Sequence, residues 1–136
     1  MWFTSDNASG AAPEVMAAVT AANAGYARSY GADPFMDRAR DQIREIFEAP
    51  EAAVYLVATG TVANALALSL YCPPWGAVFC HQHAHITEDE CGAPEFYMHG
   101  AKLVLVHGAH GRMDPAALEA AIVKAKGGGV HGVQAA

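Results

Sequence analysis

The stretch LVATGTVANAL, residues 56–66, joins an apolar run to an alanine-rich run through three small residues, Thr59, Gly60 and Thr61. The first run has the composition of a buried strand and the second that of a helix. The stretch therefore predicts a strand that turns directly into a helix. A helix start at such a turn offers free backbone N–H groups, a glycine that admits a close ligand, and hydroxyl donors. A phosphate suits this loop; a tight turn with a threonine cap is the alternative.

The same pattern recurs downstream. Apolar runs at residues 52–58 (AAVYLVA), 77–81 (AVFCH) and 102–107 (KLVLVH) are each followed by a segment that has helical spacing or a helix start. Such alternation predicts an α/β fold with parallel strands and helical crossovers. The expected helices are TVANALALSLY (61–71), TEDECGAPEFYM (87–98), whose Thr87 and Glu90 have capping-box spacing, and DPAALEAAIVKAK (114–126), with Asp114 as the cap.

Two helices are expected upstream of these strands. Pro13 and Gly25 bracket the first, and Asp33 followed by Pro34 starts the second, whose apolar residues recur at helical spacing as far as Glu48. We therefore expect a helical segment over about residues 13–48. The polar face of the second helix is most simply a solvated face with local ion pairs; it carries Asp37, Arg38, Arg40, Asp41, Arg44 and Glu45.

Composition narrows the class of protein. The 136 residues are 53% apolar and 16% charged, which is ordinary for one globular domain, and the net charge of −6 argues against nucleic acid as a partner. No apolar run approaches the roughly 20 residues that span a bilayer, and MWFTSDNASG at the N-terminus does not resemble a signal peptide, so we expect no membrane partner and a cytoplasmic location. Cys72, Cys80 and Cys91 are expected to be reduced and to be mostly packing residues.

A cluster of histidines follows the second apolar run, in CHQHAHITEDE (80–90). His81, His83 and His85 alternate, so their rings would share one face if the strand continued through them, as metal ligands can. Two other interpretations stay open: a loop with diverging rings, or a single imidazole stacked on a flat ligand.

Several motifs in register resemble the N-terminal part of the threonine aldolase and β-eliminating lyase family. They are FTSDNASGAAPEVMAAV (3–19), SYGADPFMDRARDQIREIF (29–47), ATGTVANALAL (58–68), VFCHQHAHITEDECGAPEF (78–96) and GRMDPAALEAAI (111–122). The resemblance implies the pyridoxal-phosphate-dependent, aspartate-aminotransferase-like fold. It also implies that residues 1–136 are the N-terminal portion of the cofactor-binding large domain, and that the parent protein is a homo-oligomer.

The resemblance implies roles for particular residues. Gly60 and Thr61 would hold the phosphate of pyridoxal 5′-phosphate, and His85 would stack on its pyridine ring. Ser5 and Tyr30 would help to hold the substrate amino acid. The implied reaction is retro-aldol cleavage of threonine, allo-threonine or another β-hydroxy-α-amino acid to glycine and an aldehyde. His85 is the candidate catalytic residue, because an imidazole with a pKa of about 6.5 suits proton transfer near neutrality.

The family's Schiff-base lysine and its carboxylate-binding arginines are expected beyond residue 136. We expect Lys102, Lys124 and Lys126 to be solvent-exposed and to offer no substitute, so the chain alone should be inactive. In the family's sheet the first strand lies apart from the second and third, so residues 53–58 would lack a neighbour unless they repack beside the second strand. Two other functions stay open: a small metal-binding module using His81, His83 and His85, and a non-catalytic α/β phosphate-binding domain.

Overall fold

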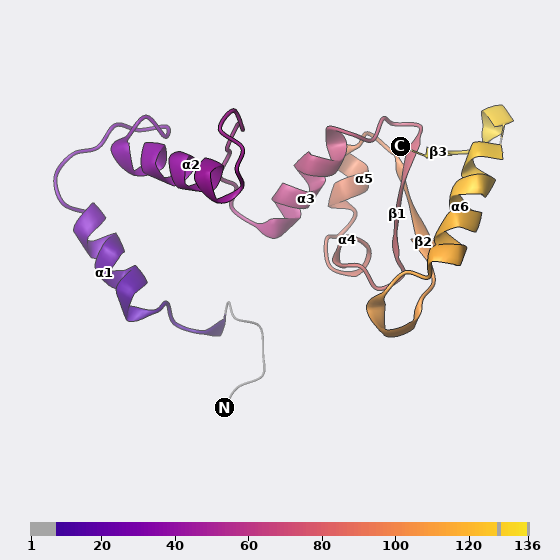
Figure 1. The fold of residues 1–136 in the computed structure, drawn as a ribbon, viewed down its shortest axis with the longest axis horizontal. Helices are drawn as coiled ribbons and strands as arrows, with labels where there is room; N and C mark the ends of the chain where they lie inside the picture. The colour runs from indigo at the N-terminus through magenta and orange to yellow at the C-terminus, as the bar shows by residue number, and fades with distance from the viewer. Residues whose placement is uncertain (1–7, 128, 136) are drawn as a thin grey trace. The chain divides into compact units, whose positions relative to one another are not determined.

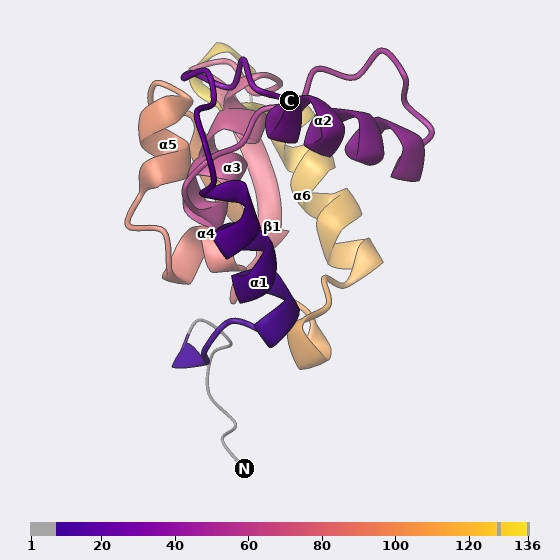
Figure 2. The same ribbon diagram turned by 90° about the vertical axis from the view of Figure 1, so that its left-hand side faces the viewer.

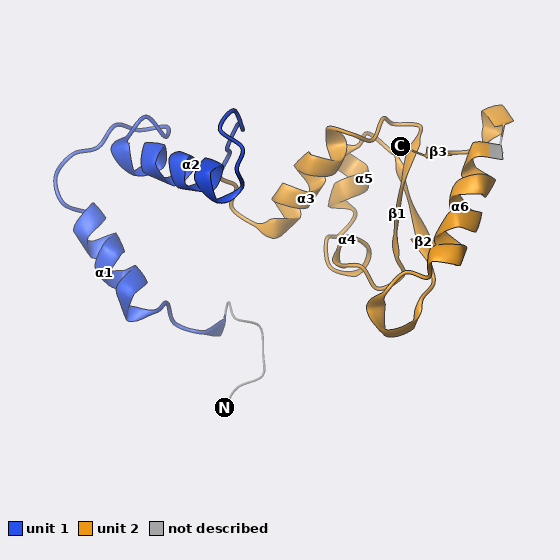
Figure 3. Cartoon of the chain, viewed as in Figure 1, with its two compact units in different colours: residues 1–55 blue, residues 56–136 orange. Residues whose placement is uncertain are grey.

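The computed structural model of the chain describes residues 8–127 and 129–135. The chain divides into two compact units, residues 1–55 and residues 56–136 (Figure 3). The division follows the change in sequence pattern, because the first unit contains the two helices expected near the N-terminus and the second contains the three strands of the described residues.

The first unit contains α1 (Pro13–Ala22) and α2 (Pro34–Ile46), both of which confirm the sequence-based prediction. The carboxylate of Asp33 caps α2 by accepting hydrogen bonds from the backbone N–H groups of Phe35 and Met36, at 2.9 and 3.0 Å. The charged face of α2 carries local ion pairs, as expected: Arg40 with Asp37 and Arg44 with Asp41.

The second unit is built on a parallel sheet of three strands in the order β2-β1-β3. The central strand β1 (Gly76–His81) pairs with β2 (Lys102–Val106) from Ala77↔Lys102 to His81↔Val106. Within residues 8–127 and 129–135, it pairs with β3 (Gln134–Ala135) only at Gly76 and Ala77. The parallel pairing that the alternating pattern predicted is therefore confirmed for the second and third apolar runs.

Helices cover both faces of this sheet. One side carries α3 (Gly60–Ser69), α4 (His85–Glu88) and α5 (Ala93–Tyr97), and the other carries α6 (Pro115–Gly127) (Figures 1 and 2). Within the first group α3 packs mainly against α5, while α6 packs against β2 and β3. As predicted, Asp114 caps α6, since its carboxylate accepts a hydrogen bond from the N–H of Ala116. Short 3-10 turns lie at Ala109–Gly111 and Gly129–His131.

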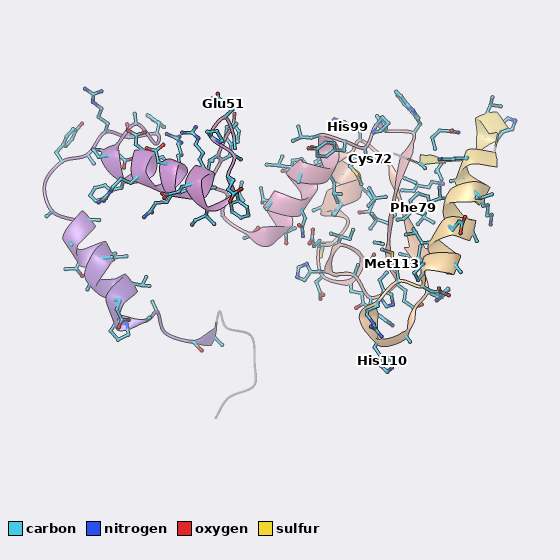
Figure 4. The ribbon with its side chains drawn as sticks, viewed as in Figure 1. Glu51, Cys72, Phe79, His99, His110 and Met113 are labelled. Atoms are coloured by element: carbon cyan, nitrogen blue, oxygen red, sulfur yellow. The ribbon has the colours of Figure 1, made fainter. Side chains whose placement is uncertain are left out.

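The buried core lies between the sheet and the α3–α5 pair. Cys72, Met98 and Ala101 are buried together, and Leu68, Val78 and Leu103 pack around them. Figure 4 shows Cys72 near the carboxyl end of α3 and Phe79 on β1. All three cysteines are free thiols, as expected; Cys72 and Cys80 are buried, whereas Cys91 is exposed and is not a packing residue. Burial raises the pKa of the Cys72 thiol, which favours its protonated, packing form.

The prediction of a first strand at residues 52–58 is wrong. Residues 52–58 are not assigned to any strand, and β1 has β2 and β3 as its neighbours, so these residues have not repacked beside it. A β-strand exists only as part of a hydrogen-bonded ladder, and an apolar, β-branched sequence cannot supply the partner. The family topology already predicted that this segment would lack a neighbour here.

The prediction of a capping box at Thr87 and Glu90 is also wrong. Residues 87–98 do not form one helix; they contribute to two short helices separated by Gly92, which is in the left-handed region at φ 73°. Thr87 lies inside α4 instead of preceding a helix, and the carboxylate of Glu90 is bonded to Asn64 and His85. A tertiary partner on α3 has replaced the local one.

Within the described part of the chain, the helices are all too short or too polar to span a membrane.

Candidate functional site

The first turn of α3 lies at the join that the sequence singled out. Thr59 is the N-cap: its hydroxyl accepts a hydrogen bond from the N–H of Val62 at 3.3 Å, and its carbonyl accepts one from Ala63. The threonine cap of the alternative interpretation is thus present. It leaves the N–H groups of Gly60 and Thr61 pointing out of the helix start, where the helix dipole favours an anion.

Gly60 faces open space. A methyl group added at its Cα would meet no other part of the protein within 4 Å, and its backbone is not in the left-handed region. Neither packing nor backbone conformation therefore requires a glycine here. The space before the α3 start can admit an anionic group close to the backbone.

A buried carboxylate connects α3 to the histidine cluster. Oε1 of Glu90 accepts a hydrogen bond from Nδ2 of Asn64 at 2.7 Å and lies 2.7 Å from Nδ1 of His85. Asn64 lies four residues after Gly60 and three after Thr61, so the three share one face of α3. The hydrogen bonds therefore connect the His85 imidazole to α3, the helix whose start is the candidate anion site.

The environment of His85 is asymmetric. Its side chain is 63% exposed, whereas the Glu90 side chain bonded to it is fully buried. The hydrogen bond to Glu90 raises the pKa of His85 above its ordinary value, the negative charges of Asp89 and Glu90 act in the same direction, and partial desolvation opposes them. The imidazole is anchored at Nδ1 while the rest of the ring stays accessible.

The three histidines do not share a face. Strand β1 ends at His81, because the chain turns there with a hydrogen bond from the N–H of Ala84 to the His81 carbonyl. Nε2 of buried His81 bonds to the carbonyl of Gly108, and its Nδ1 accepts from the N–H of His83, so both ring nitrogens are used. His83 pairs with Glu88 at the surface.

These contacts do not support the metal-module interpretation. In residues 8–127 and 129–135, no three histidine, cysteine or carboxylate side chains are grouped so that they could hold a metal ion. The condition under which the three rings would converge, a strand through residue 85, is not met.

The three lysines lie at the opposite end of the sheet from His85. Lys102 opens β2 and is paired in register with Ala77, near the amino end of β1, whereas the histidines follow its carboxyl end. Lys124 and Lys126 lie in the last turn of α6, which leads back toward β3 and its pairing with the same amino end. All three side chains are exposed, as expected.

The two expected substrate-binding residues belong to the first unit. Ser5 lies outside the described residues. Tyr30 lies between α1 and α2 with a fully exposed side chain and a φ of 60°, in the left-handed region that a bulky residue rarely adopts.

A family model for β-eliminating lyases matches residues 3–136. The chain belongs to the β-eliminating lyase family. Two curated relatives are low-specificity L-threonine aldolases: that of Pseudomonas sp. strain NCIMB 10558 is 43% identical over 122 residues, and that of Pseudomonas aeruginosa is 44% identical over 116. These matches cover 90% and 85% of this chain and 35% and 33% of the relatives, so the chain spans about a third of their length.

A solved structure agrees with this assignment. The threonine aldolase of Leishmania major superposes with a TM-score of 0.86 at 31% identity, over 98% of this chain and 38% of that one. The predicted resemblance to threonine aldolases and the predicted fold, the aspartate-aminotransferase-like α/β type, are both confirmed.

Two polar residues of the candidate site are not predicted from the sequence. The sequence pattern places Asn64 in an alanine-rich helix and makes Glu90 one half of a capping box. The usable signal was the position of Glu90 five residues after His85, next to the left-handed turn at Gly92. Its partner, Asn64, is 26 residues away in sequence, and only the packing of α3 against α5 brings the two together.

The residues of the site suit the cofactor that the family resemblance implies. The open space before Gly60, with the outward N–H groups and the Thr61 hydroxyl, suits a phosphate monoester. The accessible ring of His85, held at one nitrogen, suits stacking on a flat heteroaromatic ring. Neither feature needs a residue from outside the second unit.

Proposed function

We propose that this chain forms part of a pyridoxal-phosphate-dependent lyase of the threonine aldolase type. In this proposal Gly60 and Thr61 hold the cofactor phosphate, and His85 covers the cofactor ring and acts in catalysis. The reaction is the retro-aldol cleavage of a β-hydroxy-α-amino acid, threonine or allo-threonine, to glycine and an aldehyde.

One observation carries the proposal most directly: the hydrogen bonds from Asn64 and His85 to one oxygen of Glu90. They connect a helix start that suits an anion to an accessible imidazole within a single unit, and these are two of the contacts that a phosphorylated heteroaromatic cofactor needs. The sequence identity of 43% and 44% to two low-specificity L-threonine aldolases supports the reaction class.

The bound cofactor would supply an electron sink for the pair released when the Cα–Cβ bond breaks. The chain's own residues hold the cofactor in position and transfer protons. The N–H groups of Gly60 and Thr61 fix the phosphate at the α3 start, while His85, anchored through Nδ1, presents Nε2 as a proton acceptor for the β-hydroxyl or an intervening water.

Substrate binding is proposed for Ser5 and Tyr30. The left-handed backbone at Tyr30 supports this role, since strained residues concentrate at functional sites. That the complete enzyme is a homo-oligomer and that it is cytoplasmic stay predictions.

The first test compares two proteins. One is the 136-residue chain; the other is a chimera in which residues 1–136 are followed by the part of the Pseudomonas aeruginosa relative beyond the matched region. We expect the chimera to bind pyridoxal phosphate and release glycine from threonine, and the chain alone to release none, because its three lysines lie at the far end of the sheet.

The readouts are glycine production and lysine labelling. After incubation with the cofactor and reduction by borohydride, the chain should show no stoichiometric modification of Lys102, Lys124 or Lys126. Labelling of one of these lysines together with threonine cleavage would make the chain self-sufficient. A folded chimera without lyase activity would count against the proposed reaction.

A further inference from the structure

We propose that Glu90 is a positioning residue, which keeps the proton of neutral His85 on Nδ1 and its lone pair on Nε2, and which ties the imidazole to α3 through Asn64. The inference deepens the proposed function and rests on it for its catalytic meaning. The hydrogen bonds of Glu90 involve only residues of this chain, so they can be tested without cofactor.

Contacts with two other elements hold the carboxylate of Glu90. It lies between α4 and α5, takes a hydrogen bond from Asn64 on α3, and meets His85 at the start of α4, with both distances at 2.7 Å. Its side chain is fully buried, although His85 is 63% exposed. A buried carboxylate carries a large desolvation cost unless it is well bonded, so this arrangement is held by more than local propensity.

The chemistry of the donors fixes the tautomer. Asn64 donates through its amide nitrogen to Oε1, and a carboxylate oxygen can accept a second hydrogen bond but cannot donate one when ionised. Nδ1 of His85 must therefore carry the hydrogen at this contact. Nε2 is left as the basic nitrogen, and among the described residues it has no hydrogen-bond partner.

His81 shows that this tautomer is not a general property of the cluster. Its Nε2 faces the carbonyl of Gly108 and its Nδ1 accepts from the N–H of His83, so His81 carries its hydrogen on Nε2. The two histidines lie four residues apart and have opposite tautomers, each set by its partner.

The charged groups that act on His85 are Glu90 and Asp89. The contribution of α3 is the neutral Asn64. In the part of the chain that the structure describes, the second oxygen of Glu90 is buried without a hydrogen-bond partner, so Oε1 accepts both of the hydrogen bonds described. Removing the negative charge of Glu90 should therefore lower the pKa of His85.

The experiment is an imidazole titration by NMR, with ¹⁵N-labelled histidine and no cofactor. The signals of His85 are assigned by their loss in His85→Gln. The measurement is made on the 136-residue chain and repeated on the chimera, so that self-association of the short chain does not decide the result. Wild type, Glu90→Gln and Glu88→Gln are compared.

Glu88→Gln is the matched control, because Glu88 forms the same kind of contact with His83, also at 2.7 Å, but at the surface. We expect wild-type His85 to be the Nδ1–H tautomer and to titrate above the usual histidine midpoint. Glu90→Gln should lower that midpoint and mix the tautomers. Glu88→Gln should leave His85 unchanged.

A wild-type His85 that carries its proton on Nε2 would overturn the proposal without any variant. So would a His85 midpoint in Glu90→Gln that matches wild type. In the chimera, Glu90→Gln should also lower kcat about 10- to 100-fold, and it should shift the acidic limb of the activity profile, which follows the deprotonation of His85, to lower pH. An inactive wild-type chimera with the expected titration would reject the lyase assignment and keep the positioning role.

Discussion

Gly60 is the residue at which folding and ligand binding make different demands. It opens α3, and an added methyl group would meet no protein atom within 4 Å. Alanine is the better helix former, by about 0.8–1.0 kcal/mol in a helix interior. A glycine here is consistent with the need to keep space for a ligand.

We therefore predict that Gly60→Ala keeps or slightly raises the free energy of unfolding, by up to about 1 kcal/mol. In the chimera the same change should weaken pyridoxal phosphate binding at least about tenfold, because a Cβ at the helix start enters the phosphate space. Urea unfolding and a fluorescence titration with the cofactor measure the two effects.

Gly10→Ala is the control, since Gly10 also has no neighbour within 4 Å of an added methyl but is far from α3 in sequence. It should change neither quantity. Unchanged cofactor affinity in Gly60→Ala would remove Gly60 from the proposed phosphate site.

At the scale of elements, the connection from β2 to α6 depends on close backbone packing. A Cβ on Gly108 would overlap the carbonyl oxygen of Arg112, and the carbonyl of Gly108 also bonds to the buried His81 ring at the end of β1. The neighbouring N–H of Asp114 bonds back to the carbonyl of His107. The turn thus fixes the end of both strands.

We predict that Gly108→Ala lowers the free energy of unfolding by about 1–3 kcal/mol, the usual penalty for forcing atoms into packed space. The measurement is the urea midpoint of the chimera, with Gly10→Ala again as the control. The ¹⁵N shifts of His81 should change in the same variant. A midpoint equal to that of wild type would mean that this turn relaxes freely.

At the scale of the molecule, the second unit leaves backbone and apolar groups unpaired. β3 pairs with β1 only at Gly76 and Ala77, so within the described residues no strand lies against that edge of β1 from Val78 to His81. Open edges and exposed apolar side chains favour association. The exposed apolar side chains include Leu70, Tyr71, Trp75, Phe96, Leu105 and Val123.

We predict that the 136-residue chain self-associates at micromolar concentration. Its weight-average mass in sedimentation should rise with concentration. A sharp monomer boundary, together with cooperative unfolding, would show that these edges and side chains are tolerated in water.

The sequence by itself determined the elements whose signals are local. Asp33 and Asp114 predicted the starts of α2 and α6 because a cap bonds to N–H groups two or three residues away. The alternation of apolar runs and helices predicted the parallel pairing of β1 with β2. The motif around Gly60 predicted the helix start that is proposed to hold the phosphate.

Tertiary structure decided the features that need a distant partner. Residues 52–58 have the composition of a strand, yet they form none, since a strand requires a neighbour that sequence composition does not provide. Thr87 has capping spacing, but the Glu90 carboxylate is bonded instead to Asn64, 26 residues earlier. His81 and His85 differ in tautomer because Gly108 and Glu90 face them. Local hydrogen bonds are set by sequence spacing, whereas these contacts exist only once α3, β1 and β2 have packed.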